Sequence, residues 1–218
     1  MRGVVFLDGE YSDPGFYAGL ARGADLVVAA DGGARFLLEE GLRPDLVVGD
    51  FDSLAAADVE RLAADGVEIM RHPVRKDCTD GELAVDEVRR RGADDLLLVG
   101  ALGALDHTLG HLAILWRLAK AGARARLATP RLAARVLVAP AATALGAPPG
   151  TRVSLVSLGG DAVVTLEGLE YSLVRGRLPG DACLGLGNAV TAAARIVVHE
   201  GAVAVLVESA GETFPEGG

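Results

Sequence analysis

The stretch LVVGDFDSL, residues 46–54, joins an apolar run to a pair of acidic residues. Residues 46–48 have the composition of a buried strand, and Asp50 and Asp52 follow it two positions apart. If the backbone stays extended, both carboxylates point to the same side. Two like charges held close together are unfavourable unless a cation lies between them. The stretch therefore predicts a buried strand that ends at a pair of aspartates, which face either solvent or a cation.

Similar apolar runs recur on both sides of this stretch and alternate with segments of helical periodicity. Strands are expected at 3–7, 24–31, 45–50, 67–70, 94–100 and 124–129, and helices at 14–23, 33–41, 55–66, 79–92 and 105–122. Thr79 and Glu82 have the spacing of a capping box at the start of the fourth helix. This alternation predicts that residues 1–128 form an α/β domain with a parallel, Rossmann-like sheet covered on both faces.

The pattern changes after residue 128. Residues 140–150 have the composition of a loop, and short apolar runs punctuated by glycine follow at 152–160, 162–168, 171–178, 194–201 and 202–209. No segment among them has the length or period of a helix. Residues 129–218 are therefore predicted to form a small antiparallel β-sandwich domain.

Composition excludes several classes of protein. With 21 basic and 30 acidic residues the formal charge is −9, which argues against non-specific binding to nucleic acid or to an anionic membrane. The two cysteines, Cys78 and Cys183, are far apart and form neither a disulfide framework nor a zinc motif. No apolar run is long enough to span a membrane, and the first residues lack the apolar core of a signal peptide. A cytoplasmic protein is expected.

Acidic residues follow several of the predicted strands. In an open parallel sheet, ligands bind beyond the carboxyl ends of the strands, so the residues that follow the strands should share one edge. That edge is expected to gather Asp31, Asp50, Asp52, Asp77, Asp80 and Asp106, with Lys76 and His107 beside them. Oxygen ligands alone suit a hard divalent cation, most simply Mg²⁺, which commonly bridges carboxylates to substrate phosphates.

Glycines at the same edge favour a phosphate ligand. Gly32, Gly33, Gly100 and Gly103 would let backbone N–H groups approach a phosphate at the start of a helix. Neither of the two common nucleotide-binding glycine motifs occurs in the chain. A phosphoryl-transfer site built from carboxylates, a metal and one lysine fits best. Each piece also has a structural explanation, because a single aspartate after a strand is usually a helix cap and a DGG turn can serve backbone geometry alone.

The motifs in this order resemble those of the thiamine pyrophosphokinase family. The matching segments are DGGA (31–34), VVGDFDS (47–53), KDCTDGELAV (76–85) and LDHTLGHL (105–112). In the second half, VSLVSLGG (153–160), GLEYSL (168–173) and LGLGNAV (184–190) are similar to the β domain of that family. The resemblance implies a homodimer with its active site between the α/β domain of one subunit and the β domain of the other. It also implies transfer of a diphosphate group from ATP to the hydroxyethyl oxygen of thiamine, with release of AMP.

The resemblance also implies roles for individual residues. It implies Asp50, Asp52 and Asp80 as magnesium ligands, and Asp31, Lys76, Asp77 and Asp106 as groups around the phosphates and the hydroxyl. It places Asn188 in the thiamine pocket, and Gly32, Gly33, Ser53, Thr79, Gly103 and His107 among the groups that bind ATP or substrate.

Three positions depart from the family pattern. The turn GALGALDH (100–107) lacks the arginine usual in that family, His111 replaces an asparagine, and GNA (187–189) stands where SNE is usual. Arg75, beside Lys76, is a hypothetical substitute for the arginine, unless it is a solvated loop residue. Two other functions stay open, namely a diphosphokinase that acts on another alcohol such as a pterin, and a non-catalytic sensor of a nucleotide or of thiamine diphosphate.

Overall fold

The computed structural model describes residues 1–208 and residue 214. The chain divides into two compact units. The first contains Met1–Ile114 and Ala123–Ala125, and the second contains Leu115–Gly122 and the described residues from Arg126 onward. The division falls inside a helix, which contributes its first turns to one unit and its last turns to the other.

The first unit is built on a parallel sheet. Its strands are β1 (Arg2–Phe6), β2 (Leu26–Ala30), β3 (Leu46–Gly49), β4 (Glu68–Arg71) and β5 (Asp95–Val99), in the order β5-β1-β2-β3-β4. All of these neighbours pair in parallel, as the alternating pattern predicts. The apolar runs of β1, β2, β3 and β5 are almost entirely buried, because helices cover a sheet of this kind.

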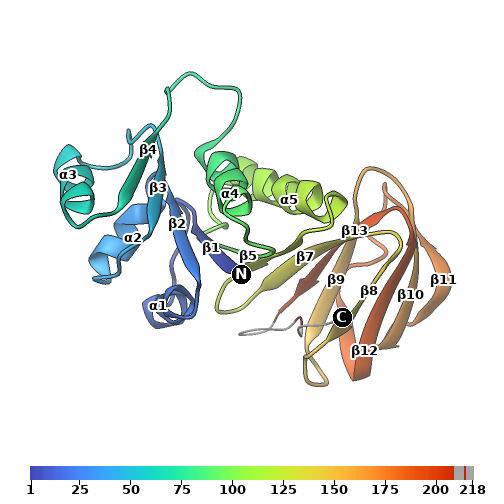
Figure 1. The fold of residues 1–218 in the computed structure, drawn as a ribbon. Coiled ribbons are helices and arrows are strands. Elements are labelled where there is room, and N and C mark those ends of the chain that lie inside the picture. The colour runs from blue at the N-terminus through green and yellow to red at the C-terminus, as the bar shows by residue number, and fades with distance from the viewer. Residues whose placement is uncertain (209–213, 215–218) are drawn as a thin grey trace. The chain divides into compact units, whose positions relative to one another are not determined.

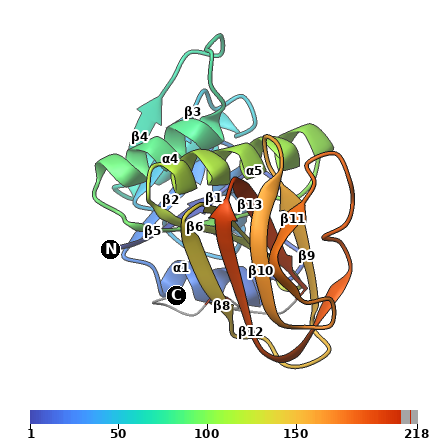
Figure 2. The ribbon, with the colours of Figure 1, turned by 90° about the vertical axis from the view of Figure 1, so that its right-hand side faces the viewer.

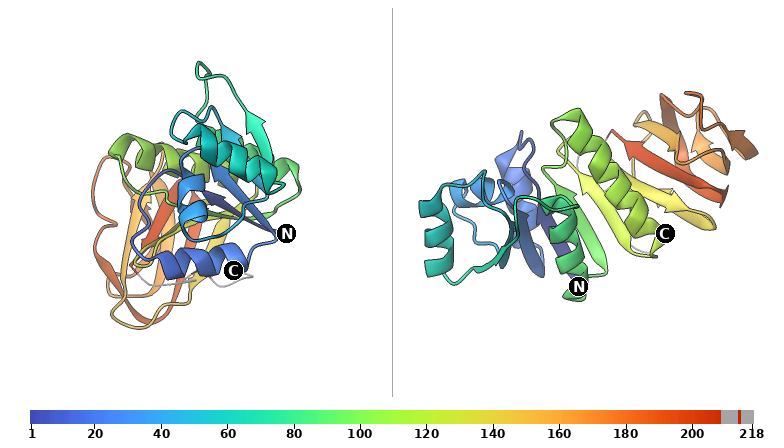
Figure 3. Two further views of the ribbon diagram at one scale, coloured as in Figure 1. Left: turned by 90° about the vertical axis from the view of Figure 1, so that its left-hand side faces the viewer. Right: turned by 90° about the horizontal axis from the view of Figure 1, so that it is seen from above.

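Helices alternate with these strands. They are α1 (Pro14–Arg22), α2 (Gly33–Glu39), α3 (Ala56–Ala64), α4 (Asp80–Arg90) and α5 (Leu105–Lys120). Helix α4 packs against β1, β2 and β3 (Figure 1), and α3 lies beside the edge strand β4 (Figure 3). The predicted capping box is present, since the Thr79 hydroxyl accepts from the Glu82 N–H at 3.2 Å and the Glu82 carboxylate accepts from the Thr79 N–H at 3.1 Å. No helix among the described residues is long and apolar enough to cross a membrane.

The second unit is built mainly from antiparallel strands. These are β6 (Arg124–Ala128), which begins in the first unit, β7 (Ala133–Val138), β8 (Ala141–Leu145), β9 (Arg152–Ser157), β10 (Ala162–Leu169), β11 (Leu173–Leu178), β12 (Asn188–Glu200) and β13 (Ala202–Val207). Strand β12 pairs with β8 over residues 194–198, with β10 mainly over its second half, and with β9 at its start. Figure 2 shows β8, β12 and β10 in the foreground. Apolar side chains from these strands share one buried cluster.

The strand predictions in this unit are incomplete, because β7 and residues 188–193 of β12 were not predicted as strands. One local prediction is also wrong. Residues 140–150 were expected to be a loop, but β8 occupies Ala141–Leu145. Thr143 in its middle is only 1% exposed and pairs with Ile196 of β12. Small residues do not mark a strand by themselves, and pairing with a distant strand decides the conformation here. The strand predicted at 202–209 corresponds to β13, and its last position, 209, lies outside the described residues.

Candidate active site

The carboxyl ends of β2 and β3 bring two aspartates together. The two strands are parallel neighbours, and the pairing continues past β2 because the N–H of Asp31 donates to the Val48 carbonyl at 2.9 Å. Asp31 has a φ of 42° and therefore lies in the left-handed region, which is uncommon for a residue with a side chain. The turn directs its carboxyl group toward the residues that follow β3.

Three carboxylates converge at this edge. One oxygen each from Asp31, Asp50 and Asp52 lie within 4.8 Å of one another. Asp31 is 8% exposed, while Asp52 is open to solvent. The buried Oδ1 of Asp31 accepts no hydrogen bond from the described part of the chain. The cluster therefore contains an unsatisfied buried oxygen next to two further acids.

The carboxylates converge for a different reason from the one that the sequence suggested. The backbone is not extended through residues 50–52, because Phe51 has a φ of 64°, so the condition for two carboxylates on one side of a strand is not met. The chain curls so that the N–H of Asp52 donates to Asp50 Oδ1 at 3.2 Å. Ser53 Oγ donates to Asp52 Oδ1 at 3.1 Å, and the Arg35 guanidinium donates to the Ser53 carbonyl. The loop that follows β3 is therefore curled, a hydrogen bond from Arg35 of α2 holds it, and its conformation orients the carboxylates of Asp50 and Asp52.

Burial and mutual repulsion affect the acids differently. The pKa of Asp31 is raised, first by burial and then by the charges of Asp52, Asp80 and Asp50, against a hydrogen bond from Ser53. The pKa of Asp50 is lowered, mainly because Lys76 donates a hydrogen bond to it. At this edge of the sheet the Asp31 carboxyl group therefore resists ionisation, whereas the Asp50 carboxyl group ionises more readily than usual.

Lys76 supplies positive charge beside the cluster. Its ammonium nitrogen lies 2.8 Å from Asp50 Oδ2 and 3.0 Å from Asp80 Oδ1, and its side chain is 12% exposed. The first contact is a hydrogen bond, whereas the contact with Asp80 is an ion pair without hydrogen-bond geometry. Burial opposes the charge on Lys76, but the two carboxylates outweigh burial and raise its pKa. Lys76 is therefore a stable cation that joins the cluster to α4.

Close backbone approach explains two of the glycines. A Cβ on Gly33 would lie 2.2 Å from the Phe6 carbonyl oxygen, and one on Gly32 would lie 2.3 Å from the carboxyl carbon of Asp8. At Gly33 the close atoms are backbone, so only glycine allows the start of α2 to lie this close to the end of β1, whereas at Gly32 the exposed Asp8 side chain could move aside. The DGG turn therefore has a structural function here, and its predicted contact with phosphate stays a prediction.

Other predicted residues lie outside this contact network. Asp77 is exposed in the loop before α4, and no described hydrogen bond or ion pair joins it to the cluster. Asp106, in the first turn of α5, accepts from the N–H of His107 at 2.9 Å. Gly103 has a φ of 156° in the turn before α5. Thr79 caps α4, so its hydroxyl is already engaged with Glu82. The roles of these residues stay predictions.

Asn188, in the second unit, is engaged with backbone. Its Oδ1 accepts from the N–H groups of Tyr171 and Ala189, both at 2.9 Å, and its Nδ2 donates to the Tyr171 carbonyl at 2.9 Å. The residue is 4% exposed. Its side chain therefore holds the chain at Tyr171, and direct contact with a substrate stays a prediction.

His111 and the pair Arg71–Phe51 were not predicted as site residues. The Nδ1–H of His111 donates to the Ala101 carbonyl at 2.7 Å, and burial lowers the pKa of its imidazole. The Arg71 guanidinium carbon lies 4.7 Å from the centre of the Phe51 ring. The histidine could have been found as a departure from the family motif, but no sequence pattern indicates the arginine–aromatic pair.

Comparisons with known proteins agree with the sequence resemblance. A sequence model described as thiamin pyrophosphokinase, catalytic domain, matches residues 17–127. Thiamine pyrophosphokinase of Bacillus subtilis (strain 168) is 30% identical over 103 residues, which are 47% of this chain and 48% of that protein. This chain thus matches about half the length of that curated relative.

Solved structures extend the likeness to the whole fold. Thiamin pyrophosphokinase from Geobacillus thermodenitrificans is 26% identical with a TM-score of 0.81, over 98% of this chain and all of that one. Thiamin pyrophosphokinase from Candida albicans is 14% identical with a TM-score of 0.81, over 95% of this chain and 88% of that one, which shows a shared fold. The family model spans residues 17–127 and therefore includes the whole acidic cluster with Lys76. The chain belongs to the thiamin pyrophosphokinase family.

Proposed function

We propose that the protein transfers a diphosphate group from ATP to thiamine and releases AMP, with Mg²⁺ as the metal. The observation that supports this best is the group of carboxylate oxygens from Asp31, Asp50 and Asp52 within 4.8 Å, beside the Lys76 ammonium. Family membership supports the choice of substrates. The region 1–128 would bind ATP and metal, and the region 129–218 would bind thiamine.

The residues of the cluster fit a hard divalent cation. All the ligand atoms are carboxylate oxygens, and the Asp31 Oδ1 is buried without a hydrogen bond. Asp50 and Asp52 would hold the ion together with Asp31 or Asp80, whose charges already act on one another. When bound, Mg²⁺ would screen the phosphate charge and stabilise the charge that develops during phosphoryl transfer.

The protein side chains would supply positioning and charge. Lys76 stays protonated at neutral pH, and its ammonium has three N–H donors, so a phosphate oxygen bound beside the cluster would accept a hydrogen bond from it. Its ion pair with Asp50 holds the loop 72–79 to the end of β3, and its ion pair with Asp80 holds the loop to the start of α4. Holding donors in place before substrate binds is the main contribution that a protein makes to phosphoryl transfer.

Incubation of the purified protein with ATP, Mg²⁺ and thiamine tests this proposal. Chromatography should show AMP and thiamine diphosphate formed in equal amounts, and no AMP when EDTA is added. A pterin alcohol in place of thiamine is the matched control for acceptor identity. AMP formed only with the pterin would replace thiamine as the acceptor, and nucleotide binding without AMP from any acceptor would indicate a sensor.

Two finer features belong to the same proposal. We expect a cytoplasmic homodimer whose active site contains groups from both subunits, as the resemblance implies. Apolar side chains on the second unit support association, since Tyr171 is 65% exposed, Val174 85%, Leu184 63% and Leu186 50%.

A further inference from the structure

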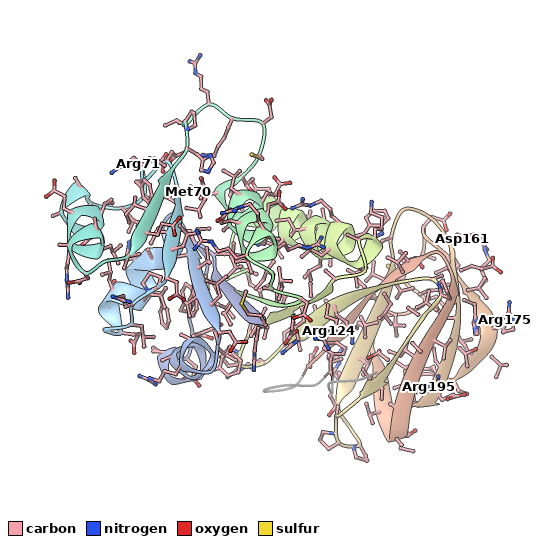
Figure 4. All side chains as sticks on the ribbon, viewed as in Figure 1. Met70, Arg71, Arg124, Asp161, Arg175 and Arg195 are labelled. Atoms are coloured by element: carbon pink, nitrogen blue, oxygen red, sulfur yellow. The ribbon has the colours of Figure 1, made fainter. Side chains whose placement is uncertain are left out.

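An aromatic ring holds the guanidinium of Arg71 at the edge of the sheet that bears the acidic cluster. Arg71 is the last residue of β4 and pairs with Gly49, the residue before Asp50. Its guanidinium carbon lies 4.7 Å from the centre of the Phe51 ring, and Phe51 is 8% exposed. Figure 4 shows Arg71 where β4 ends and the chain enters the loop 72–79. The guanidinium is thus anchored to the residue between Asp50 and Asp52.

The donors of this guanidinium are not engaged by other groups. In the part of the chain that the structure describes, Arg71 makes no side-chain hydrogen bond and no ion pair, although Asp50 and Asp52 flank its aromatic partner. A guanidinium carries five N–H donors in one plane, whose geometry matches that of a phosphate. The Arg71 guanidinium can therefore form a bidentate pair of hydrogen bonds with an anion.

Neighbouring basic side chains are already engaged or are not anchored. Lys76 is paired with Asp50 and Asp80, and Arg35 donates to the Ser53 carbonyl. Arg71 and Arg75 are both exposed, but only Arg71 has a described side-chain contact, the one with the Phe51 ring. An anchored donor loses less conformational freedom on binding than a free one, so it contributes more to affinity.

We propose that Arg71, resting on Phe51, binds the phosphate groups of ATP. The inference depends on ATP being the substrate, as proposed above. In this assignment Arg71 supplies a planar, permanently charged group that binds phosphate. The turn at 100–107 contains no such group. The assignment also gives Phe51 a function, since the residue stays in a left-handed conformation with a φ of 64° between two acids.

Isothermal titration with ATP, inorganic triphosphate and adenosine tests the assignment, with Mg²⁺ and again with EDTA. Arg71→Ala should raise the Kd for ATP and for triphosphate by roughly ten-fold or more, the effect of losing a charged hydrogen bond. Binding of adenosine and the KM for thiamine should not change. Arg71→Lys should recover only part of the affinity, because an ammonium lacks the planar fork.

Control variants separate charge, position and fold. Arg61→Ala removes an exposed arginine of α3 and should leave all three Kd values unchanged. Phe51→Leu keeps the apolar contact but removes the ring, so it should weaken triphosphate binding, and combined with Arg71→Ala it should add little. Circular dichroism spectra that match wild type show that a loss of binding is not a loss of fold.

The outcomes distinguish this inference from the proposed function. An ATP Kd for Arg71→Ala within about two-fold of wild type overturns the inference, because one charged hydrogen bond is worth more than that. The inference is also overturned if Arg75→Ala loses triphosphate binding while Arg71→Ala keeps it. If Arg71 governs triphosphate binding but thiamine is never phosphorylated, the inference stands and the proposed acceptor fails.

Discussion

At the scale of single residues, the buried carboxyl group of Asp31 is the least satisfied polar group of the acidic cluster. Its Oδ1 has no hydrogen-bond partner among the described residues. One carboxylate oxygen of Asp31 lies within 4.8 Å of an oxygen from each of Asp50 and Asp52. Without a cation, this arrangement lowers stability through repulsion and lost hydration. A cation bound there would reverse both effects.

Asp31→Asn should therefore raise the melting temperature of the metal-free protein and reduce the further increase that Mg²⁺ produces. Loss of the unpaired charge is worth about 1–3 kcal/mol, the usual cost of an unsatisfied buried group. Thermal melts in EDTA and in Mg²⁺ measure both effects. Asp45→Ala is the control, because Asp45 accepts a hydrogen bond from the Val27 N–H at 2.8 Å, and removal of this acceptor should destabilise the protein. A lower melting temperature of Asp31→Asn in EDTA would contradict the expectation.

Asp52 is the exposed member of the cluster, so its replacement tests chemistry more than stability. Asp52→Asn should lower turnover of ATP and thiamine by about a hundred-fold or more. Loss of a residue that only orients a metal ligand typically lowers activity by about 10–100-fold, and loss of the ligand itself should cost at least as much. The melting temperature should stay near that of wild type. Glu60→Gln, an exposed change on α3, is the control. Wild-type turnover by Asp52→Asn at limiting Mg²⁺ would exclude Asp52 as a ligand.

At the scale of elements, α4 carries an ion-pair network near its C-terminal end. Glu87 is 7% exposed, and its carboxylate accepts from Arg90 at 2.6 and 2.7 Å and from Arg91 at 2.7 Å. The pKa of Glu87 is lowered to about 2, first by the hydrogen bonds from Arg90, against the effect of burial. Because the folded state binds this proton more weakly than the unfolded state, the network stabilises the fold above pH 4.5 and loses this effect as pH falls toward 2.

Glu87→Gln should lower the free energy of unfolding at pH 7 by about 1.5–3 kcal/mol, the range for hydrogen bonds to charged groups. The difference from wild type should shrink as pH falls from 4.5 toward 2, where wild-type Glu87 also becomes protonated. Urea unfolding at several pH values measures this. Glu39→Gln, an exposed change on α2, should show little effect at any pH. A deficit of Glu87→Gln that stays constant with pH would argue against the ion pairs as its cause.

At the scale of the whole molecule, the exposed apolar side chains of the second unit predict self-association. Val174 is 85% exposed on β11, an edge strand of its sheet. Light scattering at micromolar concentration should show a dimer, because burial of such side chains against a second copy stabilises association. Val174→Glu should shift the equilibrium toward monomer, whereas Val74→Glu, at a residue 69% exposed in the first unit, should not. Only monomer in the wild-type protein would refute the prediction.

The sequence predicted the elements of the first unit well because the signals that specify them are local. Apolar runs, helical periodicity and the Thr79–Glu82 capping box all act within a few residues, and each appears where expected. Strand β8 was missed because its residues, AATAL, have no strand signature without their partner β12. Pairing between residues about fifty positions apart cannot be read from either segment alone.

The sequence by itself determined that several acids follow parallel strands and share one edge of a sheet, since the direction of the strands follows from their alternation with helices. Only the tertiary structure decided which acids meet: Asp31 joins Asp50 and Asp52, while Asp80 is paired with Lys76. It also placed the Arg71 guanidinium on Phe51. The physical reason is that contacts within the cluster depend on a curled loop and on the packing of neighbouring strands, and both are set by residues distant in the chain.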